Sequence, residues 1–167
     1  MNTDEINSTP VTQYLDKKGI TYRFFRHRGE VHSVEQAANE RGQKVDQIIR
    51  SIVFRLSRGG FVMVLVPGEK QVSWHALRRF VGTSRISMAT EAEVLQVTGY
   101  PLGAVSPFGT RQPMRILVDR GALQEEEISI GSGMRYTTVI MQCQDFIRAL
   151  GQVDVGDFAL EDIHTSN

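Results

Sequence analysis

Hydrophobic residues along this chain follow a period of two in some segments and a helical period in others. Between Phe61 and Val66 every residue is apolar, so both faces of a strand there would be hydrophobic. A strand of this kind is covered on both sides, and we expect it at the centre of a sheet. Residues 48–57 precede it across Arg58-Gly59-Gly60, a sequence typical of a β-hairpin. Further strands are expected over residues 22–26, 114–119, 128–130 and 136–142.

Helical spacing and capping residues predict the helices. Ser33-Val-Glu-Gln36 and Thr90-Glu-Ala-Glu93 both have the pattern of a capping box, and Ser73 can cap a third helix. Pro10 suits a first helical turn, while Gly19 and Gly42 are placed to end helices. Helices are therefore expected over residues 10–19, 33–42, 73–80, 90–97 and 144–150.

The order of these elements favours an α+β (mixed α/β) fold. Hairpins outnumber clear βαβ units, which argues against a doubly wound parallel sheet. With 167 residues, one domain is expected. We place it at residues 11–150, after a flexible tail of residues 1–10. Residues 151–167 form a C-terminal extension that either packs on the domain or stays mobile.

Composition narrows the possible functions. Lysine plus arginine and aspartate plus glutamate both number 19, so the formal net charge is zero. Proteins that coat nucleic acid are usually strongly basic, so any contact with RNA is expected to be local. Basic clusters at residues 17–18, 23–28 and 78–79 could serve, although each is also typical of a solvated face. No signal peptide or membrane-length apolar segment is visible, so we expect a cytoplasmic protein.

Metal and thiol chemistry find little support in the sequence. Cys143 is the only cysteine, which excludes an intrachain disulfide and a cysteine-based zinc site, and its apolar neighbours indicate an inert core thiol. His27 and His32 have no third ligand at metal spacing. We therefore expect no metal and no cofactor.

Arg50 is the most informative single residue. In a strand it shares a face with Ile48, Ile52 and the apolar residues that follow. A guanidinium group cannot be buried there unpaired. Either it extends out to solvent at the end of the strand, or it lines the mouth of a pocket and meets an anion.

The segment Gly103-Ala-Val-Ser-Pro107 lies within a breaker-rich loop over residues 98–113. Gly103 permits unusual backbone dihedrals and Pro107 stiffens the segment, so its amides could point together at an oxyanion or a phosphate. An ordinary turn is the alternative. No nucleophile elbow, phosphate loop or zinc-protease motif occurs. A hydrolase built on this chain would have to polarise an ester with backbone donors and let water attack.

Several segments together resemble a known family. Residues 98–109 resemble the glycine–proline loop of the YbaK/prolyl-tRNA-synthetase-associated domain, and residues 47–54 resemble its central strand. The segment that opens its early helix is similar to residues 31–38. Residues 86–91 and 131–133 follow in the family's order. The resemblance runs from about residue 11 to residue 150.

This resemblance implies a mixed, partly barrel-like β-sheet surrounded by helices. It also implies an aminoacyl-tRNA deacylase that hydrolyses the ester bond of mischarged tRNA in trans, with the terminal ribose hydroxyl assisting the attacking water. The implied catalytic residues are Gly103, Ala104, Val105, Ser106 and Pro107. The implied substrate-binding residues are Arg50, which stands where the family usually has a lysine, together with His32, Ser33, Ser132 and Gly133.

The expected partners are the CCA end of an aminoacyl-tRNA and an aminoacyl-tRNA synthetase, with neither DNA nor a membrane. A small, partly apolar pocket favours alanine, cysteine, serine, threonine or proline as the acyl group. One alternative is a catalytically impaired member that acts as a tRNA-, nucleotide- or synthetase-binding module. Another is a hydrolase of a different small ester.

Overall fold

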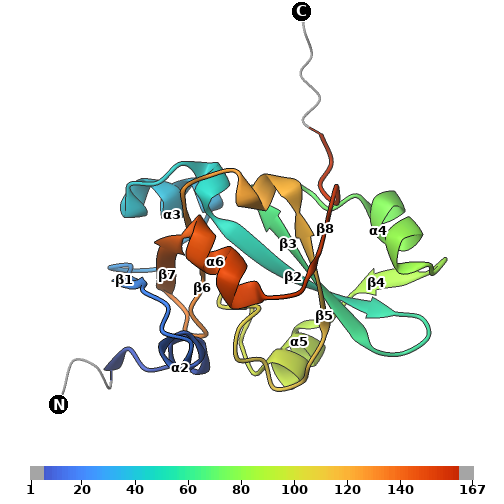
Figure 1. Cartoon of the computed structure of the whole chain (residues 1–167), viewed down its shortest axis with the longest axis horizontal. Helices are drawn as coiled ribbons and strands as arrows, with labels where there is room; N and C mark the ends of the chain where they lie inside the picture. The colour runs from blue at the N-terminus through green and yellow to red at the C-terminus, as the bar shows by residue number, and fades with distance from the viewer. Residues whose placement is uncertain (1–5, 162–167) are drawn as a thin grey trace, which may run out of the picture.

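The computed structural model describes residues 6–161, and Figure 1 shows their helices packed around two β-sheets. The helices are α2 (Pro10–Lys17), α3 (Val34–Arg41), α4 (Trp74–Val81), α5 (Glu91–Thr98) and α6 (Cys143–Leu150), with short 3-10 turns η1 (Val45–Gln47) and η2 (Arg120–Leu123). The strands are β1 (Arg23–Arg26), β2 (Ile49–Leu56), β3 (Phe61–Pro67), β4 (Ile86–Met88), β5 (Arg115–Asp119), β6 (Glu127–Gly131), β7 (Thr137–Gln142) and β8 (Asp154–Gly156).

The predicted capping residues begin their helices. The hydroxyls of Ser33, Ser73 and Thr90 each accept a hydrogen bond from the amide three residues on. One prediction was wrong in detail, because Ser33 and Gln36 do not form a reciprocal capping box. The Gln36 side chain accepts instead from the amide of His32, at 2.9 Å. This bond joins the preceding loop to the start of α3.

The strands form a five-stranded sheet in the order β4-β2-β3-β5-β8 and a three-stranded sheet in the order β1-β7-β6. The predicted hairpin is β2 and β3, and β3 lies at the centre of the large sheet with residues 62–67 buried. Ile48 bridges to Ser129 in parallel, which links the two sheets directly. The α+β class is thus confirmed. The β-structure is two linked sheets, and within residues 6–161 no closed barrel forms.

The ends of the described chain are packed against the domain. Thr9, inside the predicted tail, is buried and caps α2. Within the predicted extension, β8 pairs in parallel with β5, and Phe158 is buried. The Asp119 carboxylate fastens this segment by accepting hydrogen bonds from the amides of Phe158 and Ala159, both at 2.9 Å. The rest of the tail, residues 1–5, and of the extension, residues 162–167, lies outside the described residues.

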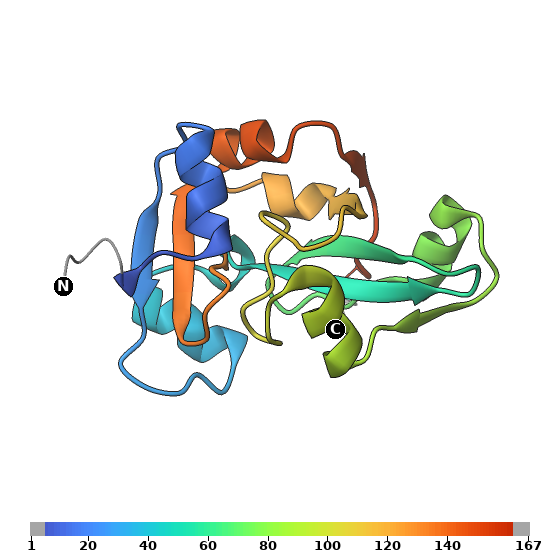
Figure 2. The same cartoon turned by 90° about the horizontal axis from the view of Figure 1, so that it is seen from below.

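The loop of residues 99–114, between α5 and β5, is an ordered part of the core. Figure 2 shows this loop lying between the small sheet and the large sheet. The buried Tyr100 hydroxyl donates to the carbonyl of Phe108 at 2.5 Å, and the Phe108 ring stacks on Tyr14 with centroids 5.2 Å apart. These contacts hold the loop from the inside. Its backbone geometry is therefore fixed by packing rather than by regular secondary structure.

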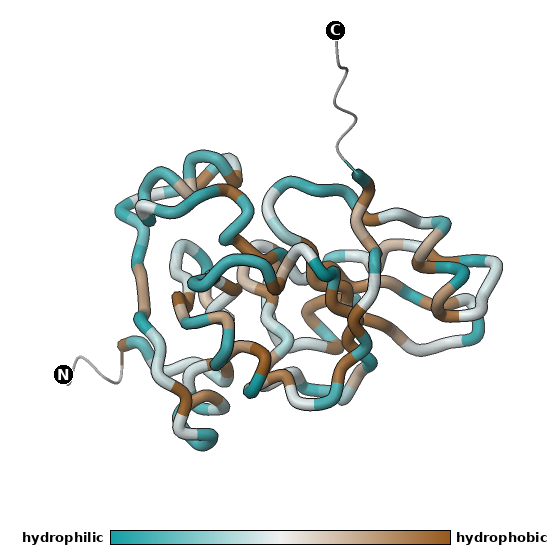
Figure 3. Tube along the Cα trace, turned by 45° about the horizontal axis from the view of Figure 1, so that its top comes forward, coloured by the Kyte–Doolittle hydropathy of each residue, from teal (hydrophilic) through white to brown (hydrophobic). Residues whose placement is uncertain are grey.

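The hydrophobic segments gather along the strands in the middle of the molecule, while the outer loops are mostly hydrophilic (Figure 3). The larger core cluster joins α2, α5 and α6 to one face of the large sheet and to the small sheet. A second cluster, which includes Phe54, Val64 and Leu77, covers the other face of the large sheet. Across residues 6–161 no helix is long and apolar enough to cross a membrane.

Candidate functional site

Two adjoining cavities open where β2, the loop of residues 99–114 and the small sheet meet. The more enclosed one, which we call the inner cavity, has a volume of about 240 Å³. The outer cavity has a volume of about 440 Å³. Both are lined by Arg41, Ile48, Arg50, Leu102, Gly103 and Thr137, so they meet along a shared wall. The site therefore has a small compartment and a larger one that share a wall containing two arginines.

The glycine–proline loop contributes backbone to this wall. Gly103, with a φ of 87°, lines both cavities, and Val105 lines the inner one. The amide of Ala104 donates to the Pro101 carbonyl at 3.1 Å. The amides of Gly103, Val105 and Ser106 have no hydrogen-bond partner among residues 6–161, although Val105 and Ser106 are buried. Buried amides without partners are rare, and at a cavity wall they are free to bind an oxygen of a ligand.

Three other residues of the predicted loop lie behind Gly103 and Val105 and do not reach the cavities. Ala104, Ser106 and Pro107 are buried and line neither cavity. The Ala104 carbonyl accepts from the amide of Gly133 at 2.9 Å, and the Ser106 hydroxyl accepts from the amide of Phe108 at 3.2 Å. Their role in this geometry is to hold the loop in place, while Gly103 and Val105 face the cavities.

Gly131, at the end of β6, explains how closely the loop approaches the small sheet. A Cβ placed there would lie 2.0 Å from the carbonyl oxygen of Val105. Only glycine leaves room for such an approach. The residue thus sets the position of the loop relative to the inner cavity.

Arg50 lies at the cavities, and its observed partners are main-chain carbonyls. Its side chain is partly buried and lines both cavities. The Nε atom donates to the Gly68 carbonyl at 2.5 Å, and Nη2 donates to the Lys70 carbonyl. Burial lowers the pKa of Arg50, and the nearby Glu69 partly opposes that shift. A guanidinium has five N–H donors, so donors remain for a ligand.

Arg41 is a second guanidinium at the shared wall, and sequence reasoning missed it. It lies in the last turn of α3, where a basic residue is ordinarily a solvated partner of the helix dipole. Here Nε donates to Nε2 of His27 at 3.0 Å, and Nη1 donates to the Ser129 hydroxyl at 2.9 Å. Burial lowers the pKa of Arg41 to about 10, so the group stays charged at neutral pH. Among the described residues, no carboxylate lies within 4.0 Å of either Arg41 or Arg50.

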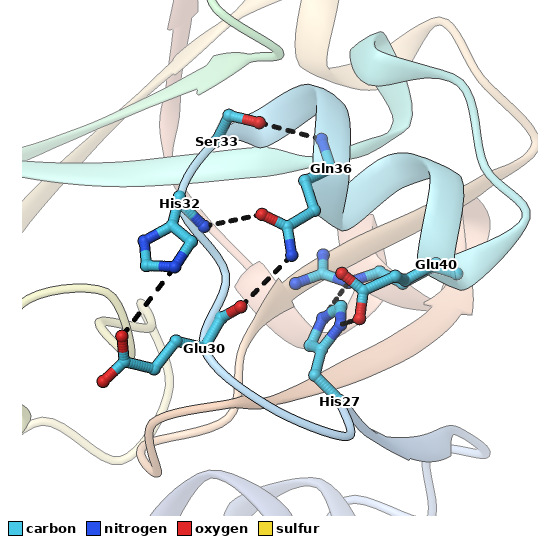
Figure 4. Close-up of polar contacts among 7 residues, drawn as sticks. His27, Glu30, His32, Ser33, Gln36 and Glu40 are labelled. Atoms are coloured by element: carbon cyan, nitrogen blue, oxygen red, sulfur yellow. Dashed lines mark hydrogen bonds and ion pairs between the residues drawn. The ribbon is translucent and has the colours of Figure 1, made fainter.

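The position of Arg41 fixes the protonation pattern of His27. Because Nε2 of His27 accepts from Arg41, Nδ1 carries the proton and donates to Glu40 at 3.3 Å (Figure 4). Burial lowers the pKa of His27, and Arg41 lowers it further, while Glu40 partly offsets both. His27 is therefore neutral at neutral pH, and its basic nitrogen is already occupied. It is not available as a general base.

The hydroxyl groups of the inner cavity are not activated as nucleophiles. The Ser51 hydroxyl is buried in its wall and has no hydrogen-bond partner within the described part of the chain. Ser129 accepts from Arg41, and Thr137 and Thr138 donate to backbone carbonyls. A serine or threonine nucleophile needs an adjacent base to take its proton. The geometry therefore supports attack by water rather than by a side chain.

The remaining predicted residues divide between the outer cavity and its surroundings. His32 and Ser33 line the outer cavity, where His32 is exposed and lies 3.8 Å from Glu30, and Ser33 caps α3 (Figure 4). Ser132 and Gly133 line neither cavity. The Ser132 hydroxyl is bonded within its own turn, and Gly133 packs against the ring of Tyr100. Gly133 supports the glycine–proline loop from outside the cavities, because its amide donates to the Ala104 carbonyl, and Ser132 lies beside it.

The described residues contain neither a cluster of metal-binding side chains nor an activated thiol. No group of three or more His, Cys, Asp or Glu side chains within residues 6–161 could hold a metal ion. Cys143 is buried, and burial raises the pKa of its thiol. A raised pKa leaves less of the reactive thiolate at neutral pH.

Comparison with known proteins gives relatives of two lengths. The chain is 31% identical over 109 residues to a proline–tRNA ligase of Thermosipho melanesiensis. The matched segment covers 65% of this chain but only 19% of the ligase. It thus spans about a fifth of that enzyme. It is 26% identical over 138 residues to the multifunctional Ser/Thr-tRNA deacylase ProXp-y of Escherichia coli K12, covering 80% of this chain and 82% of that protein.

The fold has counterparts among solved structures. A proposed trans-editing enzyme for prolyl-tRNA synthetase superposes with a TM-score of 0.83 at 23% identity, covering 96% of this chain and 99% of the other. A protein without an assigned function superposes with a TM-score of 0.82 at 24% identity, covering 91% of this chain and all of the other. At these identities the likeness establishes the fold.

The family model described as the aminoacyl-tRNA editing domain matches residues 28–149, which is well over half of the chain. This span contains α3, the β2–β3 hairpin, the glycine–proline loop and Gly131. The resemblance seen in the loop and strand motifs is therefore confirmed, and the chain belongs to the aminoacyl-tRNA editing domain family.

Proposed function

We propose that this protein is a trans-acting deacylase that hydrolyses the ester of mischarged tRNA and so contributes to translation quality control. The observation that carries the proposal is the set of unpartnered amides at Gly103, Val105 and Ser106, two of which belong to residues that line the inner cavity. Family membership and the E. coli deacylase relative support the same activity.

In this mechanism the amides of Gly103 and Val105 donate to the ester carbonyl oxygen. The negative charge that develops on that oxygen in the transition state strengthens these hydrogen bonds, which lowers the barrier. The acyl group occupies the inner cavity, and its small volume limits the acyl group to a small amino acid. Water attacks the carbonyl carbon, and the terminal ribose hydroxyl of the tRNA assists it, as the family resemblance implies.

Arg41 and Arg50 lie where the inner cavity meets the outer one. Since neither is paired with a carboxylate, they are suited to bind the phosphate next to the terminal nucleoside. Recognition of the CCA end by two arginines is compatible with a chain of zero net charge. A synthetase partner fits the occurrence of related sequences within proline–tRNA ligases.

A panel of tRNAs mischarged with alanine, cysteine, serine, threonine and proline tests the proposal. The protein is expected to release at least one of these amino acids well above spontaneous hydrolysis. A binding module is the competing function, favoured by the bonds that already commit Arg50 to the carbonyls of Gly68 and Lys70. Tight binding of the acceptor end without turnover on any member of the panel would establish the module instead.

Replacing Arg50 tests the role of its charge. Arg50→Ala is expected to raise KM by roughly 10- to 150-fold, because a charge-assisted hydrogen bond to phosphate contributes about 1.5–3 kcal/mol. Arg50→Lys keeps the charge and should lose less. Steady-state deacylation of the best substrate in the panel measures both values. Equal KM in the wild-type protein and Arg50→Ala would remove Arg50 from substrate binding.

A further inference from the structure

Tyr136, between β6 and β7, has a backbone conformation that bulky residues avoid. Its φ is 65°, and it is the one non-glycine residue in the described chain with a positive φ. The sequence predicted a strand beginning here, but β7 begins at Thr137 because Tyr136 occupies the turn. Its carbonyl accepts from the amide of His27 at 2.8 Å, which fixes the conformation. Such strain is retained mostly where a side chain must be presented in one direction.

The Tyr136 side chain is presented to the outer cavity. It lines that cavity and is 46% exposed. Among residues 6–161, its ring makes no aromatic or cation–π contact and its hydroxyl makes no hydrogen bond. Leu102, which is also 46% exposed, lines the same cavity. The outer cavity therefore has an aromatic surface and an aliphatic one that are both open to a ligand.

Positive charge surrounds these apolar side chains. Arg41, Arg50 and Arg135 all line the outer cavity, and among residues 6–161 the one carboxylate within 4.0 Å of their guanidinium groups is that of Glu91, 3.7 Å from Arg135. A flat apolar surface beside guanidinium groups matches a nucleotide, in which an aromatic base is joined to a phosphate. A peptide would satisfy the apolar surface but would leave the cluster of guanidinium groups without an anion.

We infer that Tyr136, together with Leu102, forms the stacking platform for the terminal nucleobase of the tRNA acceptor end. This inference rests on the proposed function, because the inner cavity must hold the acyl group for the outer cavity to hold the attached nucleoside. Tyr136 then fixes the position of the nucleoside, and the ester reaches the amides of Gly103 and Val105.

The test uses uncharged acceptor-stem minihelices carrying a fluorescent label, one ending in CCA and one lacking the terminal A. Binding to the 167-residue chain is followed by fluorescence anisotropy. The wild-type protein is expected to bind the CCA form about tenfold more tightly, since a base stacked on an aromatic ring typically contributes that much. Tyr136→Phe should keep this preference. Tyr136→Gly and Tyr136→Leu should lose it and bind both minihelices equally.

The glycine variant also separates stacking from misfolding. Glycine adopts a positive φ readily, so the thermal unfolding midpoint of Tyr136→Gly is expected to stay unchanged or rise while the preference disappears. A wild-type protein that binds both minihelices equally, or a Tyr136→Gly variant that keeps the preference, would overturn the inference. Preference for the terminal A with no turnover on any mischarged tRNA would refute the deacylase function and leave the nucleobase site standing.

Discussion

Replacing Gly131 with alanine is expected to lower kcat/KM for deacylation by about 100-fold or more. The added methyl would lie 2.0 Å from the carbonyl oxygen of Val105 and 2.8 Å from the carbonyl carbon of Ala104. Both contacts are with backbone, which cannot rotate away, so the loop must move. A shift of about 1 Å in a positioning group can cost about 100-fold in rate, and Gly131→Ala moves the proposed oxyanion donors themselves.

Two other glycines provide matched controls for this measurement. Gly29 has open space around it and no positive φ, so Gly29→Ala should behave as the wild-type protein does. Gly103 also has open space but a φ of 87°, so Gly103→Ala introduces backbone strain without a clash and should cost less activity than Gly131→Ala. Deacylation by Gly131→Ala at the wild-type rate, with its fold verified by circular dichroism, would exclude the loop as the catalytic element.

Replacing Arg41 with alanine is expected to reduce both stability and activity. The free energy of unfolding should fall by about 2–3 kcal/mol, because the buried acceptors on His27 and Ser129 both lose their donor. The value of kcat/KM should fall about 30-fold, since a charged hydrogen-bond donor is removed from the wall shared by the two cavities. Urea unfolding and single-substrate kinetics measure the two effects.

A positive charge at position 41 is not expected to be enough to restore the stability lost in Arg41→Ala. Arg41→Lys keeps the charge but has one donor group, which cannot reach His27 and Ser129 in the fork geometry of a guanidinium. It is expected to recover less than half of the lost free energy of unfolding. Arg148→Ala is the control, because within residues 6–161 that exposed arginine of α6 pairs only with Asp145, and such surface pairs contribute about 0–1 kcal/mol. If Arg41→Ala unfolds at the wild-type urea concentration, Arg41 does not organise the cavity wall.

Local chemistry in the sequence predicts much of the fold. Ser33, Ser73 and Thr90 begin their helices because a hydroxyl at that position satisfies an orphan amide whatever the tertiary context. The uninterrupted apolar run of β3 requires cover on both sides, which places it at the centre of the large sheet. The three-residue strands β4 and β8 were not predicted, because such short strands exist only through pairing with β2 and β5.

The candidate site was predictable where a motif carried it and not where tertiary packing made it. Arg50 and the glycine–proline loop stand out because a charge on an apolar strand face and a stiff loop are visible locally. Arg41 gave no comparable signal, since a basic residue in a last helical turn is ordinarily a surface residue. Its partner Ser129 is 88 residues away in sequence, and only the approach of α3 to β6 brings them together.

The central claim is that water attacks the ester while main-chain amides stabilise the negative charge on the carbonyl oxygen, with no nucleophilic side chain. Ser51 is the sharpest rival, because its hydroxyl is buried in the inner cavity and makes no other bond within the described residues. The decisive measurement is the single-turnover rate of deacylation by Ser51→Ala against the wild-type protein, on the tRNA that the wild-type protein hydrolyses best. A rate within about tenfold of wild type is predicted, whereas removing a true nucleophile costs about 10⁴-fold or more. A Ser51→Ala protein that is folded and inactive, with an acyl-enzyme trapped on Ser51 in the wild type, would contradict the account.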